Sequence, residues 1–285
     1  MDIQLLLVPY DTARRGWRSG AGPEHLVQAG LPAHLESCGH RVAGSQVIED
    51  DPAESPAEIR TAFELMRRVA TAVRDARAAG RFPIILSGNC NAGAVGALSG
   101  LTPEPRSIFW FDAHGESNTP ETTGSGFLDG MGLSIALGWC WRVVAASVPG
   151  FQPVAPEATF LIGARDLDPL EAALLSESRV TLVPVSDVSA GLSNRLAAAP
   201  LPEGLGYLHL DLDVLDPDSV GRANSLPAPG GLSVAQLTAS ITAVRARMPL
   251  GAATIASYAP EYDRDQAICR AALAAVEAML APAGA

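Results

Sequence analysis

The 285-residue sequence contains no lysine, and all 20 of its basic residues are arginines. Without a lysine amine, the chain cannot form a Schiff base with a carbonyl substrate or anchor pyridoxal phosphate. The same absence excludes a phosphate-binding loop that depends on lysine. The sequence is rich in Ala, Gly, Pro and Arg, so the absence of lysine also agrees with a biased composition. The absence still excludes the lysine-dependent reactions named above.

Paired cysteines and long apolar runs are also missing. The four cysteines form no CxxC pair, and we expect reduced thiols, each by default a small buried hydrophobe: Cys38, Cys90, Cys140 and Cys269. No apolar run approaches the roughly 20 residues that a membrane span needs. The first residues, MDIQLLLVPYD, carry no basic leader and are expected to form a strand rather than a signal peptide. The net charge is −11 with no basic stripe, so we expect a cytoplasmic protein that binds neither nucleic acid nor membrane.

Strand-like and helix-like segments alternate along residues 1–285 without a linker or an internal repeat. The expected strands are Ile3–Val8, Arg41–Val47, Pro83–Ser87, Ser107–Phe111, Thr159–Ile162, Val180–Val183, Gly206–Leu210 and Ala252–Ser257. The expected helices are Pro23–Ser37, Pro56–Ala79, Ala92–Leu98, Met131–Val144, Leu170–Glu177, Val188–Ala197, Ser233–Arg247 and Arg264–Leu280. Several strands are continuous apolar runs, which are typical of a parallel sheet covered on both faces. We therefore predict one domain, a three-layer α/β/α sandwich with a mainly parallel eight-stranded sheet and ligands at the carboxyl ends of its strands.

Polar side chains follow three of these strands. The segment SIFWFDAHGE ends a strand at Asp112, and two further polar residues follow at alternate positions. The segment YLHLDLDVLDP repeats this alternation around Asp211, and IILSGNCN adds a cysteine after a third strand. We expect six of these side chains to converge at one edge of the sheet: Cys90, Asp112, His114, Glu116, Asp211 and Asp213.

Carboxylates crowded in this way repel one another unless a multivalent cation neutralises them. Six ligands suit two cations that share bridging carboxylates, and a set made mostly of oxygen donors favours Mn²⁺ or Mg²⁺ over zinc. Two such ions bind a bridging hydroxide, which is a nucleophile near neutral pH. The pattern therefore predicts metal-dependent hydrolysis. The alternative is that these acids only cap turns and loops.

The motifs themselves resemble those of the arginase–agmatinase (ureohydrolase) family. DAHGESNTPETTGSGFLDGM is similar to the family's Asp-Ala-His-x-Asp-x-Asn-Thr-Pro segment, and HLDLDVLDP to its Ser-Phe-Asp-x-Asp-x-x-Asp-Pro segment. LIGARDLDPLE resembles the strand and loop between those two. The resemblance covers roughly residues 80–260 and implies a single domain with an eight-stranded parallel sheet. It also implies that the six converging side chains are metal ligands, with Glu116 in the place of an aspartate.

The resemblance further implies which residues hold the substrate. In the arginase branch, the carboxylate and amino group of an amino acid are held at positions that match Asn118, Ser125, Asp168 and Glu171. Agmatinases act on a substrate without a carboxylate, so the suitable side chains retained here favour a small-molecule α-amino acid. The Pro- and Gly-rich segment 222–231 is expected to form a loop over the site, and Ser225 in this loop is a further candidate substrate contact.

Three positions depart from the family pattern. Cys90 replaces a histidine ligand, and a thiolate is a softer donor that makes a divalent metal other than Mn²⁺ compatible with the site. Asp129 stands where arginases carry a proton-shuttling histidine, and it could move protons or hold a cationic substrate end. Ser257 replaces a glutamate that pairs with the guanidinium. Either Asp129 or Glu261 takes over this pairing, or the distal group of the substrate is a weak base.

Cys90, His209 and the NTPETT loop resemble a small branch of the family, the Nω-hydroxy-L-arginine hydrolases of antibiotic biosynthesis. A hydroxyguanidine is far less basic than a guanidinium and tolerates the loss of an acid at Ser257. We therefore predict hydrolysis of Nω-hydroxy-L-arginine to hydroxyurea and ornithine with two Mn²⁺ ions. Asp213 would orient the hydroxide, and Asp129, His209 or solvent would protonate the leaving amine. His209 is otherwise a strand histidine packed beside the ligands.

Three alternatives stay open. A hydrolase of the same fold could act on a formimino, ureido or amide derivative of an amino acid, which Ser257 supports. An inactive member could bind an amino acid, which the altered positions support. A metal-free enzyme with Cys90 as nucleophile and His209 as base would leave the carboxylates unexplained. Arginases are often trimers or hexamers, so a homo-oligomer is compatible with the chain, but no sequence pattern identifies an interface.

Overall fold

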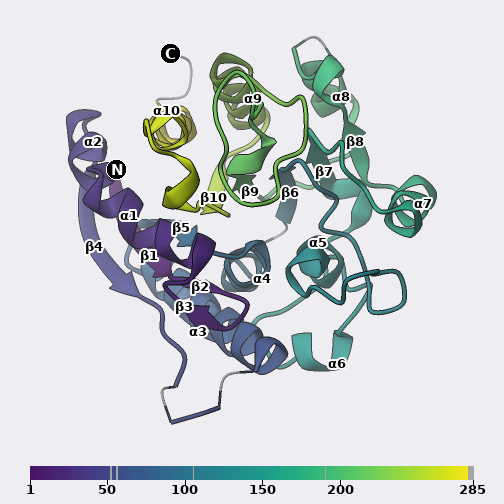
Figure 1. Ribbon diagram of the computed structural model, residues 1–285, viewed down its shortest axis with the longest axis horizontal. Coiled ribbons are helices and arrows are strands. Elements are labelled where there is room, and N and C mark those ends of the chain that lie inside the picture. Colours follow the sequence, from purple (N-terminus) through teal and green to yellow (C-terminus); the bar gives the residue numbers. More distant parts are fainter. Residues whose placement is uncertain (52, 56, 105, 190, 282–285) are drawn as a thin grey trace.

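The computed structural model describes residues 1–285 with the exception of 52, 56, 105, 190 and 282–285. Its centre is an eight-stranded sheet in which neighbouring strands are parallel (Figure 1). In spatial order the strands are β4 (Arg41–Val47), β1 (Asp2–Val8), β5 (Phe82–Ser87), β10 (Leu250–Ala256), β9 (Leu205–Asp211), β6 (Arg106–Phe111), β7 (Thr159–Ile162) and β8 (Thr181–Val183). The eight predicted strands are confirmed, with small shifts at their ends.

The helices connect these strands and cover the sheet. They are α1 (Gly22–Gln28), α2 (Leu31–Ser37), α3 (Glu58–Ala78), α4 (Cys90–Gly100), α5 (Gly132–Ala136), α6 (Arg142–Ala145), α7 (Pro169–Glu177), α8 (Gly191–Ala198), α9 (Val234–Arg247) and α10 (Ala267–Leu280). Short 3₁₀ turns are η1 (Arg18–Ala21), η2 (Asp129–Met131), η3 (Pro156–Ala158), η4 (Val185–Asp187), η5 (Leu212–Val214) and η6 (Pro260–Tyr262). The continuous helices predicted over 23–37 and 131–144 are wrong, because Gly30 and Gly138 adopt φ values of 103° and 73° that interrupt them.

Two hydrophobic cores lie on opposite faces of the sheet. Successive strand residues point to opposite faces, so on β1 the side chain of Leu6 packs in one core and that of Leu5 in the other. The first core joins the sheet to α3, α4 and α5, and the second joins it to α1, α2, α8, α9 and α10. Figure 1 shows these two groups of helices on either side of the sheet. The predicted three-layer α/β/α sandwich is confirmed.

The carboxyl ends of the strands lie along one edge of the sheet, since the strands run in the same direction. Five consecutive neighbours, in the order β1, β5, β10, β9 and β6, bring their following loops together there. The loop after β1 forms a small hairpin, β2 (Tyr10–Asp11) with β3 (Arg14–Arg15). It lies against Gly88, where a Cβ would come within 2.3 Å of the Tyr10 carbonyl oxygen. A glycine here lets the two loops touch, which places the hairpin beside the residues that follow β5.

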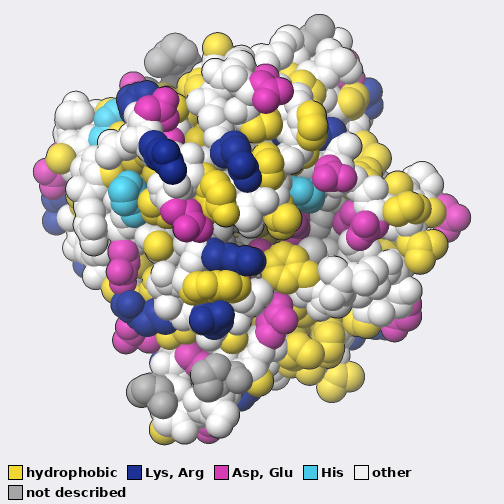
Figure 2. All heavy atoms as spheres, viewed as in Figure 1, with side chains coloured by type: hydrophobic (Ala, Val, Ile, Leu, Met, Phe, Trp, Pro, Cys, Tyr) yellow, Lys and Arg dark blue, Asp and Glu magenta, His cyan; other side chains and the backbone are white. Residues whose placement is uncertain are grey.

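The surface gives two further observations. On the face seen in Figure 2, basic and acidic side chains of the described residues are interspersed rather than gathered in one broad patch of a single sign. Among the described residues, no helix combines the length and apolar character that a membrane span requires.

Candidate metal centre

The six predicted ligands meet at the carboxyl ends of β5, β6 and β9. Cys90 begins α4, Asp112 follows β6, and Asp211 is the last residue of β9. Cys90 and Asp112 are fully buried, and Asp211 is 3% exposed. Ligand-type atoms within 4.8 Å of one another form three overlapping groups: Asp112–His114–Asp213, Cys90–Glu116–Asp129 and Cys90–Asp112–His209. The structure therefore brings together side chains that lie up to about 120 positions apart in the sequence.

On one side of this cluster, His114 stands between two carboxylates. Its Nδ1 lies 3.2 Å from Asp213 Oδ2 and 3.5 Å from Asp112 Oδ1. Burial alone would lower the pKa of His114, but these two carboxylates outweigh it and raise the pKa to about 12. The two carboxylates thus favour positive charge at this position, which a divalent cation would also supply.

The carboxylate of Asp213 is held firmly on this side. It accepts hydrogen bonds from the Ala113 backbone N–H at 3.1 Å and from Asn224 Nδ2 at 3.0 Å. Burial tends to raise the pKa of Asp213, but the hydrogen bonds and charge of His114, together with Asn224, lower it to about 2. Asp213 is therefore an ionised acceptor with a fixed orientation.

On the other side, Cys90 and Glu116 lie deep in the protein. The Cys90 thiol donates to Asp211 Oδ2 at 3.1 Å, and burial together with the Asp211 charge raises its pKa well above the usual value. Glu116 has a φ of 50°, in the left-handed region that non-glycine residues seldom adopt. Its Oε2 is buried without a hydrogen-bond partner.

This donor set fits a bound cation. Burial and neighbouring carboxylates raise the pKa values of Glu116 and Asp211 well above their usual range. It is costly to keep these two carboxylates ionised, because they are buried and neighbouring carboxylates repel their charge. A divalent cation would partner the orphaned Glu116 Oε2 and remove the repulsion among the acids.

Asp129 anchors the start of α4. Its carboxylate accepts hydrogen bonds from the backbone N–H groups of Asn91 at 2.9 Å and Cys90 at 3.1 Å, and from Asn89 Nδ2 at 2.7 Å. Burial raises its pKa to about 7 in spite of these bonds. Negative charge at a helix N-terminus is favourable, so Asp129 both fixes the Cys90 backbone and borders the cluster.

Ser257 closes the cluster from β10. Its φ of 61° points the hydroxyl inward, with Oγ 3.4 Å from Cys90 Sγ, and its carbonyl oxygen accepts from Asn224 Nδ2 at 3.3 Å. Glu261 is exposed and does not line the cavity that lies over the cluster. It is one of the two acids considered as a replacement for the missing glutamate. A carboxylate that does line this cavity is Asp11 of the β2–β3 hairpin, which is 5% exposed.

Several lining residues were missed by the sequence reasoning. Beside Asp129, Ser225 and Ser257, the cavity over the cluster is lined by Asp11, Arg18, Phe127, Asn224 and Leu226. Asp11 carried a usable signal, because it follows the apolar strand β1 as Asp112 follows β6. Asn224 lies in the 222–231 loop that was expected over the site, but nothing in that loop singled it out. Arg18, Phe127 and Leu226 had no distinguishing pattern.

A second cavity of about 250 Å³ adjoins the first. It shares His114, Glu116, Phe127 and Leu226 with it and is also lined by the four predicted amino-acid contacts: Asn118, Ser125, Asp168 and Glu171. Asn118 Nδ2 donates to Asp168 Oδ2 at 3.0 Å. The two cavities thus form one path from the metal cluster to a polar outer end.

Glu171 and Asp168 also have a structural role. They form a capping box at the start of α7, and Glu171 Oε1 accepts from the Ser117 backbone N–H at 2.8 Å. Burial raises the pKa of Glu171. The capping box fixes the rim of the second cavity, and Asp168 is the more open of the two acids.

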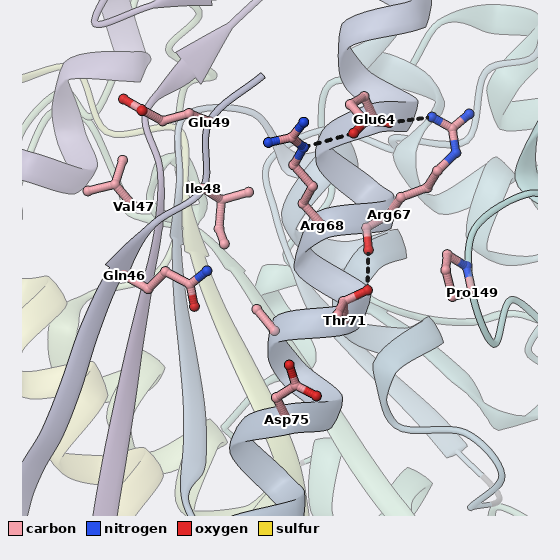
Figure 3. A pocket seen from close by; sticks show the side chains of 11 residues that line it. Gln46, Val47, Ile48, Glu49, Glu64, Arg67, Arg68, Thr71, Asp75 and Pro149 are labelled. Atoms are coloured by element: carbon pink, nitrogen blue, oxygen red, sulfur yellow. Dashed lines mark hydrogen bonds and ion pairs between the residues drawn. The ribbon is translucent and has the colours of Figure 1, made fainter. Parts of the chain in front are cut away.

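A larger cavity elsewhere has a different character. It measures about 430 Å³ and lies between β4 and α3 (Figure 3). Three of its charged residues pair with one another, since Arg67 and Arg68 each hydrogen-bond Glu64 at 2.8 Å (Figure 3). The converging carboxylates lie away from it, so volume alone does not locate the functional site.

A buried carboxylate cluster at the carboxyl edge of a doubly covered parallel sheet defines the class of protein: a metal-dependent hydrolase. The family model described as the Arginase family matches residues 1–281, and the chain belongs to this family. The resemblance inferred from the motifs is confirmed.

Individual relatives support this family membership. An arginase of Bacillus caldovelox is 30% identical over 247 residues, which cover 81% of this chain and 82% of that protein. An Nω-hydroxy-L-arginine amidinohydrolase of Streptomyces lavendulae is 32% identical over 177 residues, which cover 62% of this chain and 59% of that protein. The crystal structure of arginase from Bacillus cereus matches with a TM-score of 0.85 at 25% identity, covering 99% of each chain.

Family membership defines the reaction type. The chain is a metal-dependent hydrolase that acts on a C–N bond of a guanidino-type group. The family uses a site for two divalent metal ions, and the overlapping ligand groups of this chain provide candidate donors for such a site.

Proposed function

We propose that this chain hydrolyses Nω-hydroxy-L-arginine to hydroxyurea and L-ornithine. The observation that carries the proposal is Ser257, a hydroxyl rather than an acid, 3.4 Å from Cys90 Sγ at the metal end of the cavity. A weakly basic hydroxyguanidine can hydrogen-bond a hydroxyl, whereas a guanidinium cation needs a carboxylate. The 32% identity to the Streptomyces lavendulae Nω-hydroxy-L-arginine amidinohydrolase supports the same substrate.

The metal ligands are proposed as two sets that share one carboxylate, Asp112. Asp112, His114 and Asp213 would hold one Mn²⁺, and the second set would comprise Cys90, Glu116, Asp112 and Asp211. When bound, the two ions would act as Lewis acids and provide a hydroxide nucleophile. The Cys90 thiol is a softer donor than a carboxylate, so a different divalent metal on that side is compatible with the proposal.

The residues around the ions would orient the reactants. Asp213 is fixed by Ala113 and Asn224 and would accept a hydrogen bond from the attacking water. The leaving amine of ornithine must gain a proton. Asp129 lines the cavity whereas His209 lies fully buried behind it, so Asp129 or solvent is better placed to donate this proton.

The other end of the cavity would hold the amino acid itself. Asn118 and Ser125 offer neutral hydrogen-bonding groups for the α-carboxylate, and Asp168 offers an acceptor for the α-ammonium group. Ser225 and Asp11 line the inner part of the path, where the hydroxyguanidine would lie. Glu171 would act mainly through the α7 capping box.

Other functions are less well supported. Hydrolysis of a formimino, ureido or amide derivative is the second candidate, because Ser257 suits those neutral groups as well. A nucleophilic Cys90 is disfavoured, since its thiol donates to Asp211 and its pKa is raised rather than lowered. An inactive amino-acid binder is disfavoured, because binding an amino acid does not require a buried set of metal-ligand side chains.

Mass spectrometry of a substrate panel tests the proposal. Mn²⁺-loaded protein would be incubated with Nω-hydroxy-L-arginine, L-arginine, L-citrulline and N-formimino-L-glutamate. Ornithine, hydroxyurea and urea would be measured for the first three substrates, and glutamate and formamide for the last. We expect kcat/KM for hydroxyarginine to exceed that for arginine at least tenfold. Faster turnover of arginine would contradict the proposed substrate. No turnover in protein that holds two metals would favour the inactive binder.

The cellular setting is also a proposal. Among the described residues, one continuous sheet with a core on each face supports a single domain. A cytoplasmic location stays a prediction from the sequence. Members of the family are often oligomeric, and light scattering on the purified chain would show whether it forms a homo-oligomer.

A further inference from the structure

We propose that His209 is a metal ligand: its Nε2, together with Cys90 Sγ and an Asp112 carboxylate oxygen, would bind the ion on the Cys90 side. This inference deepens the proposed function, because it rests on the binuclear site. It assigns to His209 a structural bond to metal instead of a role as proton donor. It also makes the two metal positions chemically different.

The position of the His209 ring is the first argument. His209 and Asp211 are two residues apart on β9 and therefore point to the same face of the sheet. The ring is fully buried and stacks on Trp110, its partner on β6, with centroids 3.9 Å apart and 27° between the planes. A ring nitrogen lies within 4.8 Å of ligand atoms of both Cys90 and Asp112.

The hydrogen bonds of Tyr207 fix which nitrogen carries the proton. The Tyr207 hydroxyl donates to Thr254 Oγ1 at 2.7 Å, so its oxygen is left as an acceptor for His209 Nδ1 at 3.1 Å. We infer from this arrangement that Nδ1 is the protonated nitrogen and that Nε2 holds a free lone pair. A histidine that donates through one nitrogen and ligates through the other is the usual arrangement at metal sites.

Nothing among the described residues donates to that lone pair. Nε2 is buried without a hydrogen-bond partner. The Cys90 thiol is directed to Asp211 Oδ2, and the Asp112 carboxylate already accepts from Trp110 Nε1 and the His114 backbone N–H. A buried lone pair without a partner, on a ring that lies close to a carboxylate and a thiol, is unfavourable, and a shared cation would satisfy all three groups.

The donor chemistry leads to a specific expectation. A thiolate and an imidazole on one ion favour Zn²⁺ or Co²⁺, whereas the oxygen-rich His114 side favours Mn²⁺. The protein should therefore bind one equivalent of Zn²⁺ or Co²⁺ more tightly than the second.

Cobalt titration of metal-free protein tests this assignment. Wild type should bind two Co²⁺ ions, the tighter one with sulfur-to-cobalt charge-transfer absorbance. His209→Phe keeps a ring that can stack on Trp110 but has no nitrogen that could bind metal. Loss of a residue that only hydrogen-bonds a metal ligand (an outer partner) lowers metal affinity by roughly 10–100-fold. We expect His209→Phe to lower the affinity for the tighter ion by more than this. Tyr207→Phe, which removes only that outer partner, should fall within this range, and Cys140→Ser, a buried thiol outside the site, should match wild type.

The outcomes separate the two proposals. Wild-type affinity and an unchanged spectrum in His209→Phe would overturn the ligand role of His209 and leave the binuclear hydrolase intact. A wild type that binds no metal would overturn both. If His209→Phe does not fold, X-ray absorption of wild type with one equivalent of Zn²⁺ decides: sulfur and imidazole on the same ion support the proposal, and any other set of ligands overturns it.

Discussion

The two sides of the metal cluster differ in how completely their side chains are satisfied. On the His114 side, Asp213 has fixed partners in Asn224 and Ala113. On the Cys90 side, Glu116 adopts a left-handed backbone conformation and its Oε2 lacks a partner. The departures from the family pattern at positions 90, 116, 129 and 257 gather on this second side. The His114 side therefore keeps the family pattern, and the Cys90 side sets this chain apart.

Loss of a carboxylate shared by both sides should have the largest effect. Asp112→Asn keeps the shape of the side chain but removes the charge next to both His114 and Cys90. We expect both metals to be lost and the rate of hydrolysis to fall well over 100-fold. Loss of a residue that only hydrogen-bonds a metal ligand lowers metal affinity or activity by roughly 10–100-fold. Elemental analysis and ornithine release would measure this.

Asp216→Asn is the matched control for this prediction. Asp216 also follows β9, but its carboxylate caps the local turn by accepting from Ser219 Oγ and the Asp218 backbone N–H. It should retain two metals and near-wild-type turnover. If Asp112→Asn also retained both metals, Asp112 would not be a ligand shared by the two metal positions.

Substitution on the Cys90 side alone should affect one ion. Cys90→Ser exchanges a soft donor for a hard, weakly acidic one, so we expect affinity for Co²⁺ and Zn²⁺ to fall by roughly 10–100-fold and that for Mn²⁺ to fall less. Competition titrations with a chelating dye would give both affinities, and Cys140→Ser serves as the control. Equal losses for hard and soft metals would argue against a thiolate ligand.

The sequence predicted one part of this comparison better than the other. Asp112 and Asp211 were found because each ends an apolar strand, and neighbouring parallel strands bring such ends together. The hydrogen bonds of Asp129 to the α4 N-terminus were not predictable, because they join segments about 40 residues apart through loop conformation. Asn224 was missed for the same reason, whereas Asp11 was missed although it follows the apolar strand β1. The helix interruptions at Gly30 and Gly138 follow from the positive φ values of these glycines, a local signal that the predicted helix bounds did not use.

The substrate preference should respond to a charge at the metal end. Ser257→Glu would restore an acid near Cys90, and a carboxylate pairs with a guanidinium better than with a hydroxyguanidine. We expect the ratio of kcat/KM for arginine to that for hydroxyarginine to rise about tenfold. Ser257→Gln, of similar size but without charge, should leave the ratio low. A ratio that rises equally in both variants would show that size rather than charge discriminates.

The smallest effect is expected far from both metal positions. Ser125 is exposed on the rim of the second cavity, and its Oγ already accepts from the Phe127 backbone N–H at 3.2 Å. Ser125→Ala would remove one hydrogen bond to the substrate carboxylate. Because this exposed rim is solvated, we expect a loss of only about 0.5–1.5 kcal/mol, so KM should rise by roughly 2–10-fold. Since this contact is the same in the ground and transition states, kcat and metal content should stay unchanged. Steady-state kinetics would check this, with Ser176→Ala, a substitution of an exposed serine on α7, as the control. A fall in kcat would contradict the prediction and mean that Ser125 affects the chemical step as well as substrate binding.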